Sequence, residues 1–152
     1  KPSSAASDVY KRQVYVSENA KFALPELGLG IIPGAGGTQT LSRAVGERRA
    51  KELILTGRVF TAQEAVKWNL ANDIFPVDKL LDETIKIAEL ISSKAPIAVK
   101  QAKQSIHKGL QMSLSDGLSF EIEAYNRTIP TKDRIEGVLA FNEKRKPKFK
   151  GK

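Results

Sequence analysis

The sequence predicts an α/β fold that is mostly helical and has only one or two short strands. β-branched and aromatic residues gather in two brief stretches, Val14–Val16 and residues 71–77. Apolar residues recur at helical spacing through most of the chain after residue 79. A sheet this small cannot cover so many apolar helical faces. Either the helices pack on one another and on sister subunits, or the rest of the sheet lies upstream of Lys1.

The first part of the chain predicts a strand, an irregular apolar segment and two short helices. The strand covers Val14–Val16, and turn residues follow at 17–19. Residues 22–32 are expected to be buried and irregular or strand-like, because Pro25 and the glycines after it disfavour a helix. The two helices are expected from Thr38 to Gly46 and from Arg48 to Leu55, with Gly57 closing the second.

The rest of the chain predicts one more strand and a series of helices. Thr61 and Glu64 have the spacing of a capping box, which predicts a helix from about Ala62 to Leu70. Residues 71–77 form the expected strand, which Pro76 ends. The remaining helices are expected over 79–92, over 97–110 with Val99, Ala102 and Ile106 facing inward, from a Ser115 cap to Thr128, and from a Thr131 cap to Lys144.

Composition narrows the classes of protein and of site. The chain has 152 residues, 41% hydrophobic and 28% charged, which suits one globular domain, and no apolar run approaches the roughly 18 residues of a membrane span. There is no cysteine and a single histidine, His107, so neither a thiolate nor a histidine cluster can hold a metal, and no metal site is predicted. The lack of cysteine favours an intracellular location, the cytoplasm in a bacterium or the mitochondrial matrix in a eukaryote.

The formal charge of +8 is concentrated at the end of the chain, where six of the last nine residues are basic. Such a tail is expected to be solvated, although a basic segment can also bind phosphate or nucleic acid. Nucleic acid is not an expected partner, because the tail lacks interleaved aromatic residues or a recognisable binding motif. RNA binding through the basic tail nevertheless stays open as an alternative function.

Glu26 is the only charged residue between Phe22 and Ile32. A carboxylate in so apolar a stretch either turns out to water, as a surface glutamate after a proline, or is desolvated enough to exchange protons with a substrate. A glycine-rich turn follows at Gly34, Gly36 and Gly37 and feeds a predicted helix, which leaves backbone N–H groups free to hold an anion or water. The turn matches neither the P-loop nor the dinucleotide pattern, and a tight, closely packed turn is the alternative.

These residues resemble a known family. The segments KFALPELGLGIIPGAGGTQTLSR, LILTGRVF and TIPTKDRIEGVLAFNEKRKPKFKG resemble the C-terminal half of enoyl-CoA hydratases of the crotonase family, over about residues 14–152. The stretch TIPTKDRIEG is similar to the methylglutaconyl-CoA hydratase-like branch. The resemblance implies that residues 14–77 form the C-terminal part of the ClpP-like spiral core and residues 78–152 a helical trimerisation region. Residues 1–13 are expected to be a non-native or disordered leader.

The resemblance also implies roles for individual residues. Glu26 matches the second of two glutamates that hold a water and add it across the double bond of a 2-enoyl-CoA, and Gly34 matches the glycine whose N–H helps to hold that water. Leu29, Phe141 and Lys144 are the expected contacts of the substrate and its CoA. The CoA thioester is the substrate, so no cofactor is expected, and the implied assembly is a homotrimer or a dimer of trimers.

In the family, the first glutamate and both oxyanion-hole segments precede the position of residue 14. This polypeptide alone is therefore expected not to hydrate an enoyl-CoA. The parent activity would serve fatty acid or branched-chain amino acid degradation, and an enoyl-CoA isomerase of the same family is the alternative reaction.

Overall fold

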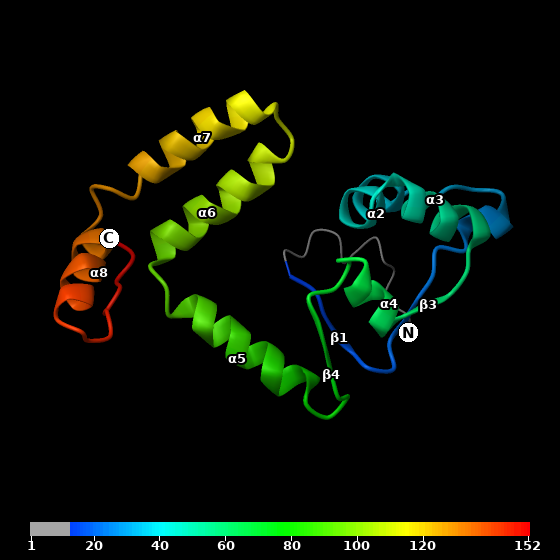
Figure 1. Ribbon diagram of the computed structural model, residues 1–152, viewed down its shortest axis with the longest axis horizontal. Coiled ribbons are helices and arrows are strands. Elements are labelled where there is room, and N and C mark those ends of the chain that lie inside the picture. The colour runs from blue at the N-terminus through cyan, green and yellow to red at the C-terminus, as the bar shows by residue number, and fades with distance from the viewer. Residues whose placement is uncertain (1–12) are drawn as a thin grey trace. The chain divides into compact units, whose positions relative to one another are not determined.

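The computed structural model describes residues 13–152, which form two compact units that divide between Thr84 and Ile85 (Figure 1). The expected leader falls almost wholly on residues 1–12, which lie outside the described residues. The boundary between the units lies inside helix α5, Leu80–Ser92.

Two small sheets frame the first unit. Strand β1, Tyr15–Ser17, pairs in parallel with β4, Asp73–Phe75. Strand β2, Lys21–Phe22, pairs antiparallel with β3, Phe60–Thr61. The expected strands at 14–16 and 71–77 are confirmed as β1 and β4. The β2–β3 pair was not predicted, because two residues are too few to display a strand period.

The first three helices of the first unit each end at a glycine. A short 3-10 helix, η1, covers Glu26–Leu29, and α2, Gly37–Val45, ends at Gly46 as predicted. Helix α3, Glu47–Thr56, ends at Gly57, whose φ of 61° belongs to the left-handed region that glycine adopts without strain.

Helix α4, Ala62–Lys67, begins with the predicted capping box. The Glu64 N–H donates to Thr61 Oγ1 at 3.3 Å, and the Thr61 N–H donates to the Glu64 carboxylate at 2.9 Å. The helix ends before the expected Leu70, because Asn69 adopts a φ of 61°, which an α-helix cannot continue.

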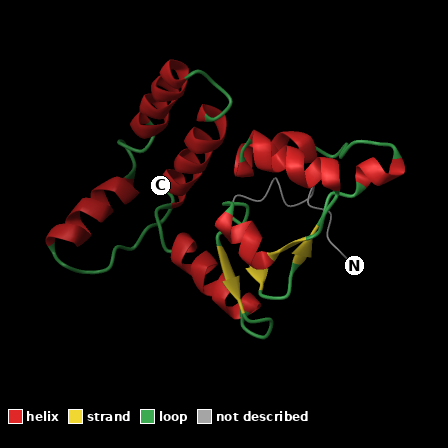
Figure 2. Ribbon diagram, turned by 45° about the vertical axis from the view of Figure 1, so that its right-hand side comes forward, coloured by secondary structure: helices red, strands yellow, loops and turns green. Residues whose placement is uncertain are grey.

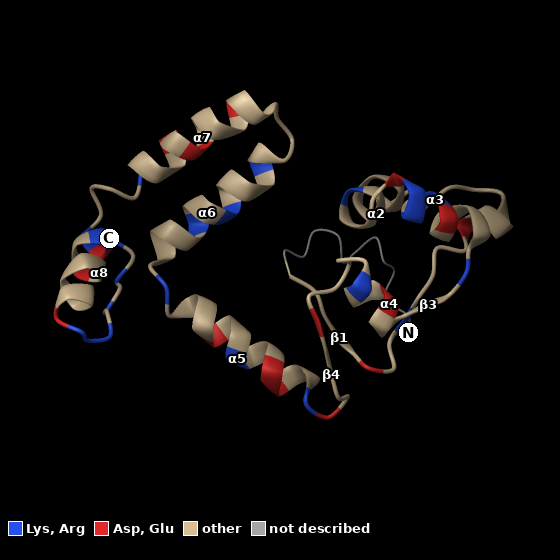
Figure 3. Cartoon of the chain, viewed as in Figure 1, with Lys and Arg blue, Asp and Glu red and all other residues tan. Residues whose placement is uncertain are grey.

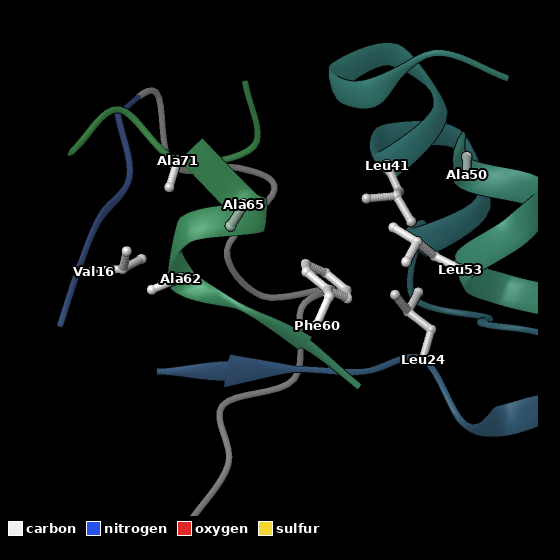
Figure 4. Packing of buried hydrophobic residues seen from close by; sticks show 9 residues of the cluster. All are labelled: Val16, Leu24, Leu41, Ala50, Leu53, Phe60, Ala62, Ala65 and Ala71. Carbon is white, nitrogen blue, oxygen red and sulfur yellow. The ribbon is translucent and has the colours of Figure 1, made fainter. Parts of the chain in front are cut away.

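The core of the first unit lies between the β2–β3 pair and the helices around it (Figure 4). Phe60 and Leu53 are fully buried, and the Phe60 ring stacks on Phe22 with 5.3 Å between ring centroids. Each such side chain contributes about 1.5–3 kcal/mol on burial. Leu24 and Leu41 also belong to this core and connect η1 and α2 to it (Figure 4).

The expectation that residues 22–32 are buried was wrong for most of the segment. Leu24 is buried, but Leu29 is 77% and Ile32 67% exposed, and Ile31 is exposed as well. The segment is held to the core at Leu24 and at the buried Pro33. Between these two points the chain turns through η1 and Gly30, so the apolar side chains in between have no core to face.

The second unit contains helices α6, Pro96–Gly109, α7, Leu114–Asn126, and α8, Lys132–Asn142, together with the end of α5 (Figure 2). Helices α6 and α7 lie side by side in opposite directions (Figure 1). They approach closely at one end, where a Cβ on Gly117 would lie 3.5 Å from Gly109 Cα.

Two local expectations for these helices were wrong. Ser113 caps α7 in place of Ser115, and its hydroxyl accepts a hydrogen bond from the Asp116 N–H at 3.2 Å. On α6, Ile106 is 66% exposed and Ala102 is exposed, whereas Gln101 is buried. Gln101, Ala102 and Ile106 all border a shallow hollow shared with α7, so Ala102 and Ile106 lie at the rim of the α6–α7 contact and are not buried in it.

The basic tail, residues 145–152, is anchored to α8 by its backbone, which corrects the expectation of a merely solvated segment. Asp133 is only 2% exposed, and its two carboxylate oxygens accept from the N–H groups of Lys150 and Gly151, each at 2.7 Å. The Glu136 carboxylate accepts from the Lys148 N–H, also at 2.7 Å. The lysine side chains remain exposed, so the tail is fixed in place while its charges face solvent.

Within residues 13–152, no helix combines the length and the apolar character needed to cross a membrane.

Candidate active site

The proposed catalytic carboxylate stands at the start of η1. Pro25 precedes it, and the Gly28 N–H donates to the Pro25 carbonyl at 2.9 Å, which closes the first tight turn. The Glu26 carbonyl accepts from the Ile31 N–H at 3.3 Å, so the backbone of the turn is satisfied internally. Gly30, with a φ of 75°, then ends η1. The backbone thus holds Glu26 in place without using its side chain.

The Glu26 side chain has an unused oxygen. Glu26 Oε2 is buried and makes no hydrogen bond within residues 13–152. Leaving a buried acceptor without a donor costs about 1–3 kcal/mol. Most buried polar groups in native structures have a hydrogen-bond partner, so this oxygen is available to a donor from another molecule.

The glycine at the C-terminal end of α3 packs against the residues that precede η1. A Cβ on Gly57 would lie 3.5 Å from Pro25 Cα and 3.6 Å from the Leu24 carbonyl oxygen. Because Leu24 is itself in the core, the residue before Pro25 is fixed on two sides. The position of Glu26 therefore depends on the packed core rather than on a free loop.

Gly34, Gly36 and Gly37 differ in whether the structure requires a glycine at the position. Gly37 has no room for a side chain, because a Cβ there would lie 2.9 Å from Pro33 Cβ and 3.0 Å from Leu24 Cδ2. Gly36 caps α2 with a φ of 89°. Gly34 has neither a close contact nor a positive φ that would require glycine, because a Cβ there would meet only the Ile32 carbonyl oxygen, at 3.8 Å. Within the described residues its N–H makes no hydrogen bond, so it is free to donate.

The predicted site residues fall into two groups. Glu26, Leu29 and Gly34 share the segment between β2 and α2, and the Leu29 side chain projects into solvent. Phe141 and Lys144 lie at the end of α8 in the second unit, where the Phe141 ring is 84% exposed and Lys144 has a φ of 52°. The Lys144 N–H donates to the Phe141 carbonyl at 3.2 Å, which places these two residues in one turn.

An ion-pair network around Trp68 was not expected from the sequence. The Arg58 guanidinium donates to Glu52 at 2.9 Å and to Glu64 at 3.0 Å. Arg49 and Arg58 both lie over the Trp68 ring, 4.5 and 5.2 Å from its centroid. The hydrogen bond from Arg58 lowers the pKa of Glu52, and the Thr61 N–H is the main cause of a lowered pKa at Glu64. The network joins α3 to α4.

A broad hollow of about 820 Å³ borders this network. Its lining includes Arg48, Arg49, Lys67, Trp68 and Asn69. The sequence contained no signal for it, because its walls come from separate helices.

Residues 10–152 match the protein family described as enoyl-CoA hydratase/isomerase. The chain belongs to the enoyl-CoA hydratase/isomerase family. This family member is 45% identical over 130 residues to the short-chain-enoyl-CoA hydratase of Clostridium acetobutylicum, covering 86% of this chain and 50% of that protein. It is 44% identical over 137 residues to the mitochondrial enoyl-CoA hydratase of Pongo abelii, covering 90% of this chain and 47% of the relative.

The fold agrees with solved structures of the family. The 1.8 Å crystal structure of the enoyl-CoA hydratase from Bacillus anthracis matches with a TM-score of 0.91 at 50% identity. The match covers 93% of this chain and 55% of that one. The chain therefore spans about half the length of the relatives it matches, as a mostly helical α/β structure with short strands.

Proposed function

We propose that Glu26 is one of the two catalytic glutamates of a 2-enoyl-CoA hydratase. Hydration forms a C–O bond at the β-carbon and a C–H bond at the α-carbon, and Glu26 exchanges the proton at the α-carbon. The observation that carries this proposal is the buried Glu26 Oε2, which has no donor within residues 13–152. The names of the relatives, which are enoyl-CoA hydratases, support the same reaction class.

Gly34 supplies the second element of the proposed site. Its N–H is free and its position tolerates a Cβ, so the residue is not needed for packing. That combination suits an amide that donates to the oxygen of the attacking water. The backbone donor is fixed by the turn between Pro33 and Gly37, so it needs little rearrangement during the reaction.

The substrate is proposed to contact three exposed side chains. Leu29 and Phe141 offer apolar surface to the acyl chain or the CoA, and the Lys144 ammonium serves as a point charge for a phosphate. The similarity of the segment TIPTKDRIEG to methylglutaconyl-CoA hydratases supports a proposed role in branched-chain amino acid or fatty acid degradation.

The proposed site needs a second glutamate from outside the described chain. Glu26 is the only carboxylate among residues 22–46. The unmatched half of the full-length relatives is the proposed source of the other glutamate and of the oxyanion hole. The 152-residue polypeptide by itself is therefore proposed to be inactive.

The assembly is proposed to be a homotrimer or a dimer of trimers. Large apolar side chains are exposed on the helices of residues 78–152, the proposed trimerisation region, while residues 14–77 belong to the spiral core. Exposed examples are Leu81, Leu90, Ile106, Leu118 and Ile122. Burial of such side chains between subunits would remove them from water.

A chimera tests the proposed reaction. The half of the Clostridium acetobutylicum relative that this chain does not match is joined ahead of Val14, and the loss of the enoyl thioester absorbance of crotonyl-CoA is followed. The chimera is expected to hydrate crotonyl-CoA, and the 152-residue chain is expected not to. Glu26→Gln in the chimera should lower kcat by about 10²–10⁴-fold, the usual range for a general acid–base residue.

Glu18→Gln is the matched control, because Glu18 is an exposed glutamate of the same unit. It is expected to leave kcat within about twofold. Equal losses in the two variants would refute a specific role for Glu26. If the chimera shifts the double bond of a 3-enoyl-CoA and does not hydrate crotonyl-CoA, the reaction is the isomerisation instead.

A further inference from the structure

The tail that follows α8 presents its lysines on one side. The tail runs back along α8. The Lys148 N–H donates to the Glu136 carboxylate, and the Lys150 N–H donates to Asp133, which lies one turn earlier in the helix than Glu136. Phe149 and Gly151 face the protein: a Cβ on Gly137 would lie 3.6 Å from the Phe149 ring, and one on Gly151 would lie 3.6 Å from Pro96. The even-numbered residues from 146 to 152 are all lysines, and all are exposed. Figure 3 shows blue stretches, which mark Lys and Arg, along the segment that follows α8.

Three of these lysines, Lys148, Lys150 and Lys152, border a hollow of about 550 Å³ beside the first turns of α8. Its lining residues are Lys132, Asp133, Glu136, Arg145, Lys148, Lys150 and Lys152. Five of these side chains are cationic and two are anionic, so the lining carries a formal charge of 5 − 2 = +3.

Both carboxylates that line the hollow already accept hydrogen bonds from the protein. Asp133 accepts from the N–H groups of Lys150 and Gly151. Glu136 accepts from the Lys148 N–H and from the Arg145 guanidinium, at 2.6 and 3.0 Å. The ammonium groups of Lys132, Lys148, Lys150 and Lys152 form no ion pair within residues 13–152, although the charge of Lys148 is a minor cause of the lowered pKa of Glu136.

Unpaired like charges gathered around one hollow repel one another and focus a positive potential in it. The N-terminal dipole of α8, which begins at Lys132, adds to that potential. A ligand that relieves the repulsion must bring several negative charges within a small volume. Phosphate groups do this, and ammonium groups bind them as point charges.

We propose that this hollow binds an oligophosphate group, meaning two or three phosphates joined together, through Lys132, Lys148, Lys150 and Lys152. The charge of such a group is comparable to the +3 of the lining. Lys144 does not line this hollow, although its neighbour Arg145 does. The oligophosphate is either a free inorganic one or part of a nucleotide such as CoA.

The test measures binding to the full 152-residue chain at low ionic strength. Inorganic pyrophosphate and adenosine 5′-diphosphate are titrated separately while backbone amide NMR signals are followed. Pyrophosphate is expected to shift the signals of Lys148, Lys150 and Lys152. Binding of both ligands indicates a site for any clustered phosphates, and binding of the nucleotide alone identifies a nucleotide as the source.

Matched variants distinguish a specific phosphate site from nonspecific electrostatic attraction of phosphate to a basic protein. Lys148→Gln with Lys150→Gln is expected to raise the dissociation constant about tenfold, and the double arginine variant at the same positions should restore binding. Lys100→Gln with Lys103→Gln changes the net charge equally at exposed positions of α6 and should have little effect. Equal weakening by both glutamine pairs, or no shift with either ligand, would overturn the proposal.

Discussion

Gly37 and Leu24 are in such close contact that a Cβ on Gly37 would lie 3.0 Å from Leu24 Cδ2. Leu24 precedes Pro25 and the Glu26 turn, and Gly37 begins α2. The contact therefore joins the two ends of the segment that carries Glu26 and Gly34. The geometry of the candidate site therefore depends on the close approach of Gly37 to Leu24.

Substituting Gly37 by alanine is expected to destabilise the fold by about 1–3 kcal/mol, because overpacking forces Leu24 and Pro33 to move. Urea denaturation of the chain measures the change. Gly34→Ala is the matched control, since its Cβ would meet only one atom, at 3.8 Å. It should leave stability within about 0.5 kcal/mol. Comparable losses for the two variants would contradict the close-contact explanation.

Asp133→Asn is expected to release the end of the tail. The asparagine side chain keeps one acceptor oxygen but turns an amide donor toward one of the two backbone N–H groups that the carboxylate now binds. Because Asp133 is almost fully buried, the expected cost is about 1–3 kcal/mol. Amide hydrogen exchange should accelerate at Lys150 and Gly151.

Glu89→Gln controls for the loss of a charge, because Glu89 is an exposed acidic residue of the same unit. It should leave the exchange of the Lys150 and Gly151 amides unchanged. If Asp133→Asn also leaves both amides protected, the carboxylate is not what anchors the tail.

Acid is expected to detach the middle of the tail. The Arg145 guanidinium, with help from the Lys148 N–H, lowers the pKa of Glu136 from 4.5 to about 2. A lowered pKa in the folded state means that the contribution to stability is fully present above pH 4.5. It is lost as the pH falls from there to about 2. Exchange protection of the Lys148 amide should fall over this range.

Glu136→Gln should remove most of that pH dependence, because the glutamine side chain does not titrate. Protection of the Lys148 amide that stays constant down to pH 2 in the unsubstituted chain would contradict the assigned ion pair.

Signals confined to a few neighbouring residues predicted local structure well. Gly46 and Gly57 ended their helices where expected, and the Thr61–Glu64 capping box is present. Each of these depends on backbone conformation or hydrogen bonds within one turn. The choice between Ser113 and Ser115 failed because both can cap a helix, and the side chain alone does not decide between them.

Features that depend on distant parts of the chain were less predictable. The apolar character of Leu29 and Ile32 suggested burial, yet burial requires a neighbouring surface that the local sequence does not describe. The role of Asp133 as the anchor of residues 150 and 151 could not be predicted without the path of the tail. Glu26 was singled out in the sequence as the one charge in an apolar stretch, but its unpartnered oxygen depends on the packing around it.

The most direct measurement of the central claim follows the α-proton of the substrate. The chimera is incubated with 3-hydroxybutyryl-CoA in heavy water, and deuterium entering at the α-carbon is measured by NMR. If Glu26 exchanges that proton, Glu26→Gln should slow the incorporation at least about 100-fold, while Glu18→Gln leaves it unchanged. Incorporation at the original rate in the Glu26→Gln chimera would contradict the account.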